Sequence, residues 1–235
     1  MQLNTNRMNK KIEKTITIFL ILILIGCTKD DDKTNPYPSD YLNYQTQTNL
    51  KLPFNEEFVI GWGGRTIEQN YHAEFREQRF AMDIVQMTNG NTHSGSGNNN
   101  SDYYCFGKTL ISPGEGTIIE LLNSVDDNIP GSVNSNQPAG NYIIIEHLNG
   151  EYSFIGHLKK SSIIVNVGDV VTQGQELAEI GNSGQSSEPH IHYHMQNSSN
   201  PLNGDGLPTQ FLNYYSNDIF ISRGEPVKNE KVRNQ

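Results

Sequence analysis

Residues 142–196 read YIIIEHLNGEYSFIGHLKKSSIIVNVGDVVTQGQELAEIGNSGQSSEPHIHYHMQ and carry the strongest fold signals in the chain. Short runs rich in β-branched and aromatic residues alternate with Gly, Asn, Asp and Pro, which is the pattern of strands joined by turns. Asn149-Gly150 stands between two apolar runs and predicts a β-hairpin. The segment therefore predicts an antiparallel β-sheet.

The same pattern extends on both sides of this segment, with no stretch of a dozen residues at a period of 3.6. Residues 67–79 are the best helical candidate and a weak one, and the polar insertion at 88–101 (TNGNTHSGSGNNNS) predicts an exposed loop. We expect one mostly β domain over residues 51–222 with little helix, followed by a disordered, charged tail over 223–235. The expected strands are 80–85, 117–122, 142–146, 152–155, 163–167, 176–180 and 191–195.

Composition excludes several classes of protein. The 235 residues have a formal net charge of −9, which argues against nucleic acid binding because such proteins usually present a basic surface. The two cysteines exclude a disulfide-rich scaffold and a four-cysteine zinc site.

The N-terminus has the features of an export signal. A basic stretch containing Arg7 and Lys14 precedes an apolar run from Ile16 to Ile25, which is too short for a spanning helix of roughly 20 residues. The run ends in Leu-Ile-Gly-Cys, which resembles the lipobox of bacterial lipoproteins, so we expect residues 1–26 to be a signal peptide and Cys27 to be acylated. This predicts a protein of the cell envelope that is lipid-anchored to the membrane, either periplasmic or surface-facing on the outer membrane.

Residues 27–50 are polar and predict a flexible acidic tether that cannot form a core. The acidic run Asp30–Asp32 is either the start of this solvated linker or a sorting signal, since it resembles those of some surface-exported lipoproteins. If Cys27 is acylated, Cys105 has no disulfide partner within the chain.

Three histidines follow one another at every second position, as His190, His192 and His194. On a strand these side chains point to one face, where neighbouring imidazoles can reach one metal ion or one substrate. A row of surface histidines with no function is the alternative.

An aspartate inside an apolar strand is the second unusual feature. Asp83 lies in FAMDIV, where a carboxylate is costly unless it is paired or coordinates a cation. His72, in QNYHAEF, and His157, at the end of an expected strand, supply further imidazoles. Catalytic zinc sites use three such ligands and leave a fourth position open for water.

The order of motifs from Tyr142 to Gln196 resembles that of the lysostaphin-type zinc endopeptidases, a family of cell-wall peptidases. The shared elements are the His-Leu after the hairpin, the G-D-x-V-x-x-G-Q turn, the G-x-S-G loop and the P-H-x-H strand, with GKTLISPGEGTIIE at 107–120 before them. The resemblance covers roughly residues 60–222 and implies the family's duplicated hybrid motif, a β-sandwich-like barrel of antiparallel sheets.

Carried over by motif, the resemblance implies one zinc ion per chain held by His72, Asp83 and His192, with His190 and His157 beside the open position. The family commonly spaces its first two ligands by four positions, whereas His72 and Asp83 are eleven apart. If the longer gap keeps His72 away from the ion, the residues that could replace it are Glu74, Glu77 and His93.

The function implied by the resemblance is that of a zinc metalloendopeptidase that hydrolyses peptide crosslinks of peptidoglycan with a zinc-activated water. His190 is expected to act as the base and His157 as the donor to the oxyanion. The expected partners are a peptidoglycan peptide and, through the lipid on Cys27, a membrane; the expected state is a monomer that binds no nucleic acid.

Two other functions remain open. A metal-free binding or regulatory module that activates or scaffolds other cell-wall enzymes is favoured only by the long His72–Asp83 gap. A biotinyl- or lipoyl-type carrier shares the turn motif, but Lys159-Lys160 is not at a hairpin tip. Of the other histidines, His147 is expected to face solvent. His93, in the polar insertion, is expected to be incidental, as is His194 unless it orients a ligand.

Overall fold

The computed structural model describes residues 35–200 and 203–235, which belong to one compact unit of the chain. The predicted signal peptide, Cys27 and the acidic run at 30–32 lie outside these residues. Within the described ranges no helix has the length and apolar character needed to cross a membrane. The helical elements there are three short 3₁₀ turns: η1 (Tyr71–Glu74), η2 (Asn100–Asp102) and η3 (Leu148–Gly150).

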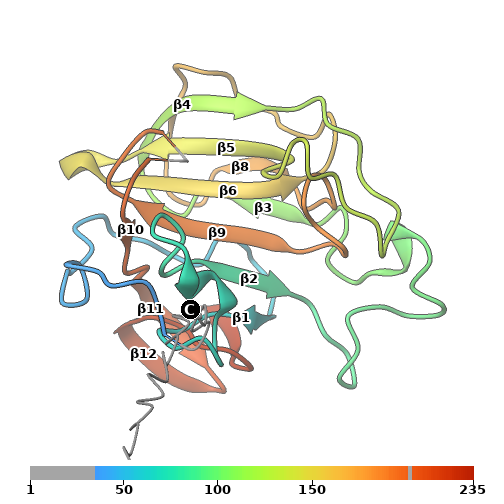
Figure 1. Ribbon diagram of the computed structural model, residues 1–235, viewed down its shortest axis with the longest axis horizontal. Helices are drawn as coiled ribbons and strands as arrows, with labels where there is room; N and C mark the ends of the chain where they lie inside the picture. The colour runs from blue at the N-terminus through green and yellow to red at the C-terminus, as the bar shows by residue number, and fades with distance from the viewer. Residues whose placement is uncertain (1–34, 201–202) are drawn as a thin grey trace, which may run out of the picture. The chain divides into compact units, whose positions relative to one another are not determined.

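Antiparallel strands make up the rest of the regular structure, which confirms the mostly β prediction (Figure 1). The large sheet has the order β12-β11-β13-β1-β2-β9-β6-β5-β4-β7, with β10 paired to β9, and a second sheet consists of β3 and β8. The strands are β1 (Phe58–Trp62), β2 (Met82–Val85), β3 (Thr109–Ile111), β4 (Gly116–Leu122), β5 (Asn141–Glu146), β6 (Tyr152–Leu158), β7 (Val170–Val171), β8 (Glu176–Glu179), β9 (Ile191–Gln196), β10 (Gly206–Leu207), β11 (Phe211–Ser216), β12 (Ile219–Gly224) and β13 (Lys231–Asn234).

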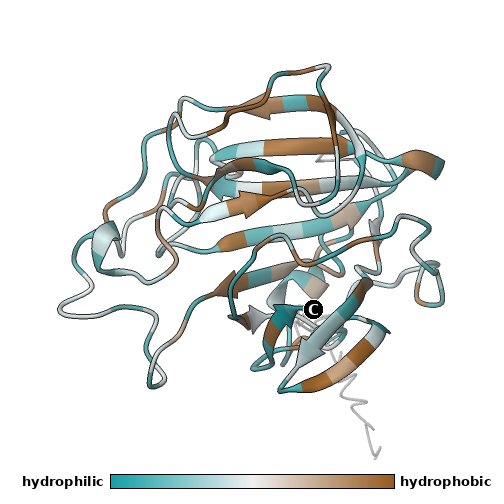
Figure 2. Ribbon diagram, turned by 180° about the vertical axis from the view of Figure 1, so that it is seen from behind, coloured by the Kyte–Doolittle hydropathy of each residue, from teal (hydrophilic) through white to brown (hydrophobic). Residues whose placement is uncertain are grey.

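The core lies between the large sheet and the β3-β8 pair. Alternate residues of β9 (Ile191, Tyr193 and Met195) are fully buried in it together with residues of β3 and β8. Because strand side chains alternate between faces, His192 and His194 point to the opposite face of the large sheet. The mixture of polar and apolar residues along the central strands is visible in Figure 2.

Most of the predicted strands of residues 142–196 are present. The β5–β6 hairpin turns at Asn149 and Gly150, whose φ angles of 65° and 70° suit the predicted turn. Residues 163–167 are an exception: Ile163 and Val165 are buried, but the backbone bonds to the Asn123 side chain and to Leu177 instead of forming a ladder. The segment at 67–79 contains only the turn η1, and 88–101 is the largely exposed loop that was predicted.

Both predicted boundaries of the domain are wrong. The C-terminal residues are not a disordered tail, because β13 pairs with β1 and β11 and buries Val232 completely. At the other end, residues within the predicted tether belong to the folded unit: Leu50 and Thr46 are buried. A fully buried carboxylate, Glu151, also accepts hydrogen bonds from the backbone and side chains of residues 44–48.

Candidate functional site

Two neighbouring strands place a carboxylate opposite an imidazole. In the β2–β9 pairing Asp83 is the direct partner of His192, and both side chains lie on the face away from the core. Met82 and Ile84, on either side of Asp83, belong to the core, so alternation along β2 accounts for an aspartate in an apolar run. The same alternation along β2 therefore places Asp83 in the site and its apolar neighbours in the core.

The turn η1 brings His72 to the same place. Asn70 caps this turn: its side-chain oxygen accepts a hydrogen bond from the backbone N–H of His72 at 3.2 Å, and its amide nitrogen donates to the carbonyls of Gly64 and Ala81. His72 Nε2 lies 3.5 Å from Asp83 Oδ1, and His192 Nδ1 lies 3.1 Å from the same oxygen. The eleven-residue gap between His72 and Asp83 is thus closed by a folded turn.

One ligand atom from each of His72, Asp83 and His192 lies within 4.8 Å of the other two, and all three side chains are buried. Two imidazoles and a carboxylate at this separation are a donor set that zinc accepts. Among the described residues this is the group of three that meets the geometry. Glu74 and Glu77 line the adjoining groove, and His93 lies in the 88–101 loop, so none of the three alternative ligands belongs to the group.

The surrounding hydrogen bonds decide which ring atoms face the centre. The Asn70 amide nitrogen donates to two carbonyls, so the amide oxygen must accept from His72 Nδ1–H at 3.0 Å. Nε2 of a neutral His72 then carries no hydrogen and has a free lone pair. His190 Nδ1 donates to the carbonyl of Glu188 at 2.8 Å. In the neutral ring Nε2 then carries the lone pair, and this atom lies 3.5 Å from Asp83 Oδ1. Acceptor atoms facing a carboxylate repel one another unless protons or a cation lie between them, so the residues fit a bound cation.

Tyr71 holds the second oxygen of the carboxylate. Its hydroxyl donates to Asp83 Oδ2 at 3.0 Å, and its ring stacks on His72 with centroids 4.0 Å apart. The other carboxylate oxygen, Oδ1, therefore faces the imidazoles. The sequence reasoning missed Tyr71 and Asn70, although both stand directly before His72 in the quoted stretch QNYHAEF.

His157 reaches the same face of the sheet through an unusual backbone conformation. Alternation from Ile155, which lies in the core, would turn His157 toward the core. Its φ of 61° is in the left-handed region, which is uncommon for a residue other than glycine, and it reverses the alternation. The ring then lies 4.7 Å from that of His190 and 5.7 Å from that of His192, between centroids.

Burial and charge shift the pKa values of the four groups around the site. Burial lowers the pKa of His72 to about 4, against the opposing charge of Asp83, and burial with the charges of His190 and His192 holds the pKa of His157 well below its ordinary value. Burial also disfavours charge on Asp83 and His190. At Asp83 the attraction of His72 and then His190 outweighs it, and at His190 the attraction of Asp83 does so. The pKa of Asp83 is therefore well below, and that of His190 above, its ordinary value.

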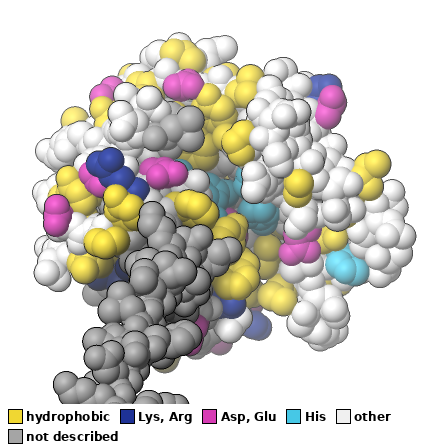
Figure 3. All heavy atoms as spheres, in the orientation of Figure 1, with side chains coloured by type: hydrophobic (Ala, Val, Ile, Leu, Met, Phe, Trp, Pro, Cys, Tyr) yellow, Lys and Arg dark blue, Asp and Glu magenta, His cyan; other side chains and the backbone are white. Residues whose placement is uncertain are grey.

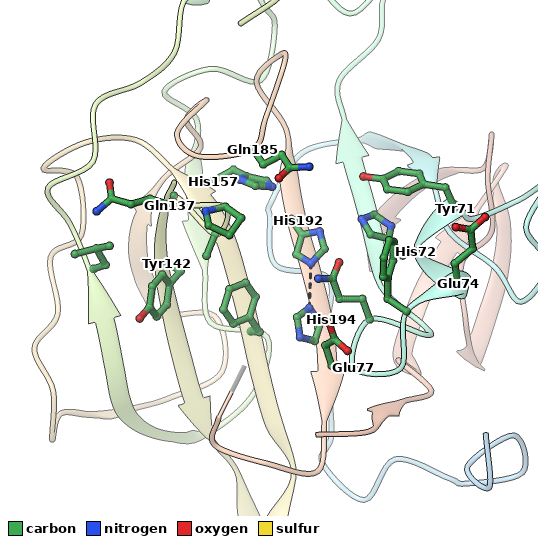
Figure 4. Close-up of a pocket in the computed structure, with 17 residues that line it drawn as sticks. Tyr71, His72, Glu74, Glu77, Gln137, Tyr142, His157, Gln185, His192 and His194 are labelled. Atoms are coloured by element: carbon green, nitrogen blue, oxygen red, sulfur yellow. Dashed lines mark hydrogen bonds between the residues drawn. The ribbon is translucent and has the colours of Figure 1, made fainter. Parts of the chain in front are cut away.

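A groove of about 590 Å³ opens over these side chains, and histidines are visible at its bottom in Figure 3. Figure 4 shows His192 and His194 side by side on β9, with His72 and Tyr71 on one side and His157 and Tyr142 on the other. Both aromatic rings and carboxylates line the groove wall, and no lysine or arginine among the described residues does so. Residues of β5, β6 and β9 line it, and its volume lies in the range of ligand-binding pockets.

The remaining histidine predictions have different outcomes. His147 does not face solvent: it is buried, because its two ring nitrogens bond to the Glu115 carbonyl and the Ser153 hydroxyl at 2.7 Å each. His194 is also buried, and its Nδ1 lies 3.0 Å from His192 Nε2, where it can orient that residue. His93 is partly buried beside Tyr103 in the insertion.

Comparison with known proteins finds one matching family and several partial relatives. Residues 102–204 match the model of peptidase family M23, a range that includes His157, His190 and His192 and begins after Asp83. The chain is 38% identical over 65 residues to the peptidoglycan DD-endopeptidase ShyA of Vibrio cholerae, a match that spans 28% of this chain and 15% of that protein. It is 32% identical over 104 residues to an uncharacterized metalloprotease of Buchnera aphidicola, which spans 44% of this chain and 24% of the relative.

The chain thus spans a quarter or less of the length of these two relatives. Among solved structures, the catalytic domain of lysostaphin from Staphylococcus simulans aligns with a TM-score of 0.38 at 21% identity, over 63% of this chain and 86% of that domain. The matched family, M23, consists of peptidases, which are hydrolases. The names of the two relatives and the residues of the site fit this class of enzyme. The stretch from 102 to 204 is thus similar to peptidase family M23.

Proposed function

We propose that this protein is a zinc metalloendopeptidase that hydrolyses peptide crosslinks of bacterial peptidoglycan. The observation that carries the proposal is the meeting of His72 Nε2, His192 Nδ1 and Asp83 Oδ1 at the bottom of a peptide-sized groove. The peptidase family and the name of the Vibrio cholerae relative support the reaction and the substrate class.

His72, Asp83 and His192 would hold the zinc ion. When bound, zinc would lower the pKa of a water molecule and polarise the scissile carbonyl. His190 is the better proton acceptor of the two flanking histidines, because the Asp83 carboxylate at 3.5 Å stabilises the charge that its ring acquires. Once protonated, His190 can pass the proton to the leaving amine.

His157 has a different task in this proposal. Its Nδ1 donates to the carbonyl of Ser183 at 2.8 Å, so the neutral ring presents a lone pair at Nε2. Donation to an oxyanion, the role expected from the sequence, would need a protonated ring, which burial opposes. His157 therefore suits the orientation of the attacking water by accepting its hydrogen bond.

The feature that favoured a metal-free regulatory module does not separate the ligands. His72 and Asp83 are eleven positions apart in sequence but 3.5 Å apart between Nε2 and Oδ1. The four histidines expected at the site line the groove or contact Asp83. We therefore propose the enzyme and not the module.

The test is digestion of purified peptidoglycan with zinc, followed by mass spectrometry of the released peptides. Wild-type protein should release crosslink peptides. His190→Ala should retain one zinc per chain and lose about 10²- to 10⁴-fold in rate, whereas Asp83→Ala should lose the zinc. No released peptide from the zinc-loaded wild type, or equal loss of zinc in both variants, would overturn the proposal.

We also propose that the protein is a lipoprotein of the cell envelope, anchored through Cys27, and that this anchor keeps it near peptidoglycan. The support is the basic stretch, the apolar run and the Leu-Ile-Gly-Cys sequence. Metabolic labelling with an alkyne fatty acid should mark the wild type and leave Cys27→Ser unlabelled. Equal labelling of both would remove Cys27 as the attachment site.

A further inference from the structure

A row of three polar side chains lies along the groove face of β9, beyond the proposed zinc ligands. His192, His194 and Gln196 are spaced by two and share one face of the strand. His192 Nε2 lies 3.0 Å from His194 Nδ1, drawn as the dashed line in Figure 4. His194 Nε2 in turn lies 3.3 Å from Gln196 Oε1.

The far end of this row fixes the direction of every hydrogen bond in it. The Gln196 Nε2 atom contacts the backbone carbonyls of Ser198 at 2.6 Å and Asn200 at 3.2 Å. Carbonyl oxygens can only accept, so this atom is the amide nitrogen and the oxygen faces His194. That oxygen also only accepts, so His194 must carry its hydrogen on Nε2.

The consequence passes to the proposed ligand. A neutral His194 with hydrogen on Nε2 has a lone pair on Nδ1, which accepts the hydrogen of His192 Nε2. His192 is then left with its lone pair on Nδ1, the atom 3.1 Å from Asp83 Oδ1. A metal can bind only the nitrogen with the lone pair, so the row makes the right nitrogen available.

Packing holds the row in place. His194 is 2% exposed and Gln196 is fully buried. The His194 ring stacks on Phe154 with centroids 4.8 Å and planes 17° apart. Burial and stacking therefore restrict the ring and its access to water, so the fold favours one tautomer.

We propose that His194 and Gln196 are positioning residues that hold His192 in the tautomer required for metal binding. This inference rests on the proposed zinc site. It assigns a task to the third histidine of HIHYH and to a glutamine that the sequence reasoning did not single out. Asn70 does the same for His72 from the other side of the site.

The first test is zinc affinity, measured by competition with a chromogenic chelator on the full-length protein in detergent. His194→Phe keeps a ring against Phe154 but offers no acceptor, and should lower zinc affinity by about 10- to 100-fold. His194→Asn places an amide oxygen near the position of Nδ1 and should retain affinity within a few-fold. Gln196→Leu removes only the terminal acceptor and should fall between these two.

His147→Phe is the matched control. His147 is as deeply buried as His194 and also bonds through both ring nitrogens, but it lies outside the groove. This variant should lose thermal stability and keep its zinc affinity. If His194→Phe binds zinc as tightly as the wild type, the proposal is overturned.

The second test needs no metal and stays informative if a variant fails to fold. Long-range ¹H–¹⁵N NMR of the metal-free wild type, at a pH of about 9 where imidazoles are neutral, reads the protonated nitrogen of each ring. Both His192 and His194 should carry hydrogen on Nε2, and hydrogen on Nδ1 of either would overturn the proposal. A wild type that shows these tautomers but binds no zinc would overturn the proposed function and leave the row intact.

Discussion

Replacing the buried carboxylate of Glu151 by the amide in Glu151→Gln should destabilise the fold by about 2–4 kcal/mol. The two carboxylate oxygens accept from the Tyr44 hydroxyl at 2.8 Å, the Gln47 N–H at 2.6 Å, the Thr48 N–H at 2.7 Å and the Thr48 hydroxyl. Hydrogen bonds to a charged group contribute about 1.5–3 kcal/mol each, against 0.5–1.5 kcal/mol for neutral pairs.

The amide keeps one acceptor oxygen, so the bonds on that side weaken by about 1 kcal/mol each. On the other side its NH₂ group opposes the Thr48 N–H, and an unsatisfied buried donor costs about 1–3 kcal/mol. The Thr48 hydroxyl can turn and accept from the amide, and removal of a buried charge offsets part of the loss. The sum is the 2–4 kcal/mol stated above.

Urea unfolding followed by the fluorescence of Trp62, the single tryptophan, measures this change. Glu146→Gln is the matched control on the same hairpin, because Glu146 is exposed and accepts one bond, from the Tyr152 hydroxyl. It should change stability by less than about 0.5 kcal/mol. If Glu151→Gln is as mild as this control, residues 44–48 do not depend on Glu151 and the reasoning is refuted.

Two other predictions concern Tyr71 and His147. Tyr71→Phe removes the hydroxyl that holds Asp83 Oδ2 and should weaken zinc binding about tenfold with little change in unfolding; chelator competition checks it, and unchanged affinity would contradict it. Burial lowers the pKa of His147 below its ordinary value of 6.5, so the unfolded chain takes up this proton first and stability falls as pH drops below about 6.5. His147→Phe should make the urea midpoint less dependent on pH between about 7 and 5 than in the wild type, and an unchanged dependence would count against this cause.

The parts of the site that follow a strand period were predictable from sequence. His190, His192 and His194 alternate with Ile191, Tyr193 and Met195, so the period of two separates groove from core without any structure. The aspartate among apolar residues at 80–85 was predictable for the same reason. Periodicity alone could not pair Asp83 with His192, because strand register depends on the whole sheet, and only the family resemblance brought the two together.

The parts that depend on irregular backbone could not be predicted from periodicity, and the family resemblance alone placed His72 and His157 at the site. His157 joins the groove only through its left-handed φ, which no residue pattern announces. His72 lies on a short turn whose cap, Asn70, is recognised from its contacts and not from a period. The groups that fix the imidazole tautomers, including Gln196, also come from the fold.

The two boundary errors have a compositional cause. Residues 41–50 and 223–235 are rich in polar residues, and few buried apolar side chains hold them, among them Leu50 and Val232. Their order comes largely from hydrogen bonds to Glu151 and from the β13 ladder, which composition does not reveal. Polarity alone therefore misidentified folded segments as disordered.

Anomalous diffraction at the zinc edge, from crystals grown with zinc, tests the central claim most directly. The account predicts one strong peak about 2.0–2.2 Å from His72 Nε2, His192 Nδ1 and a carboxylate oxygen of Asp83. A peak held by other residues, or no peak at this group in zinc-soaked crystals, would contradict the account.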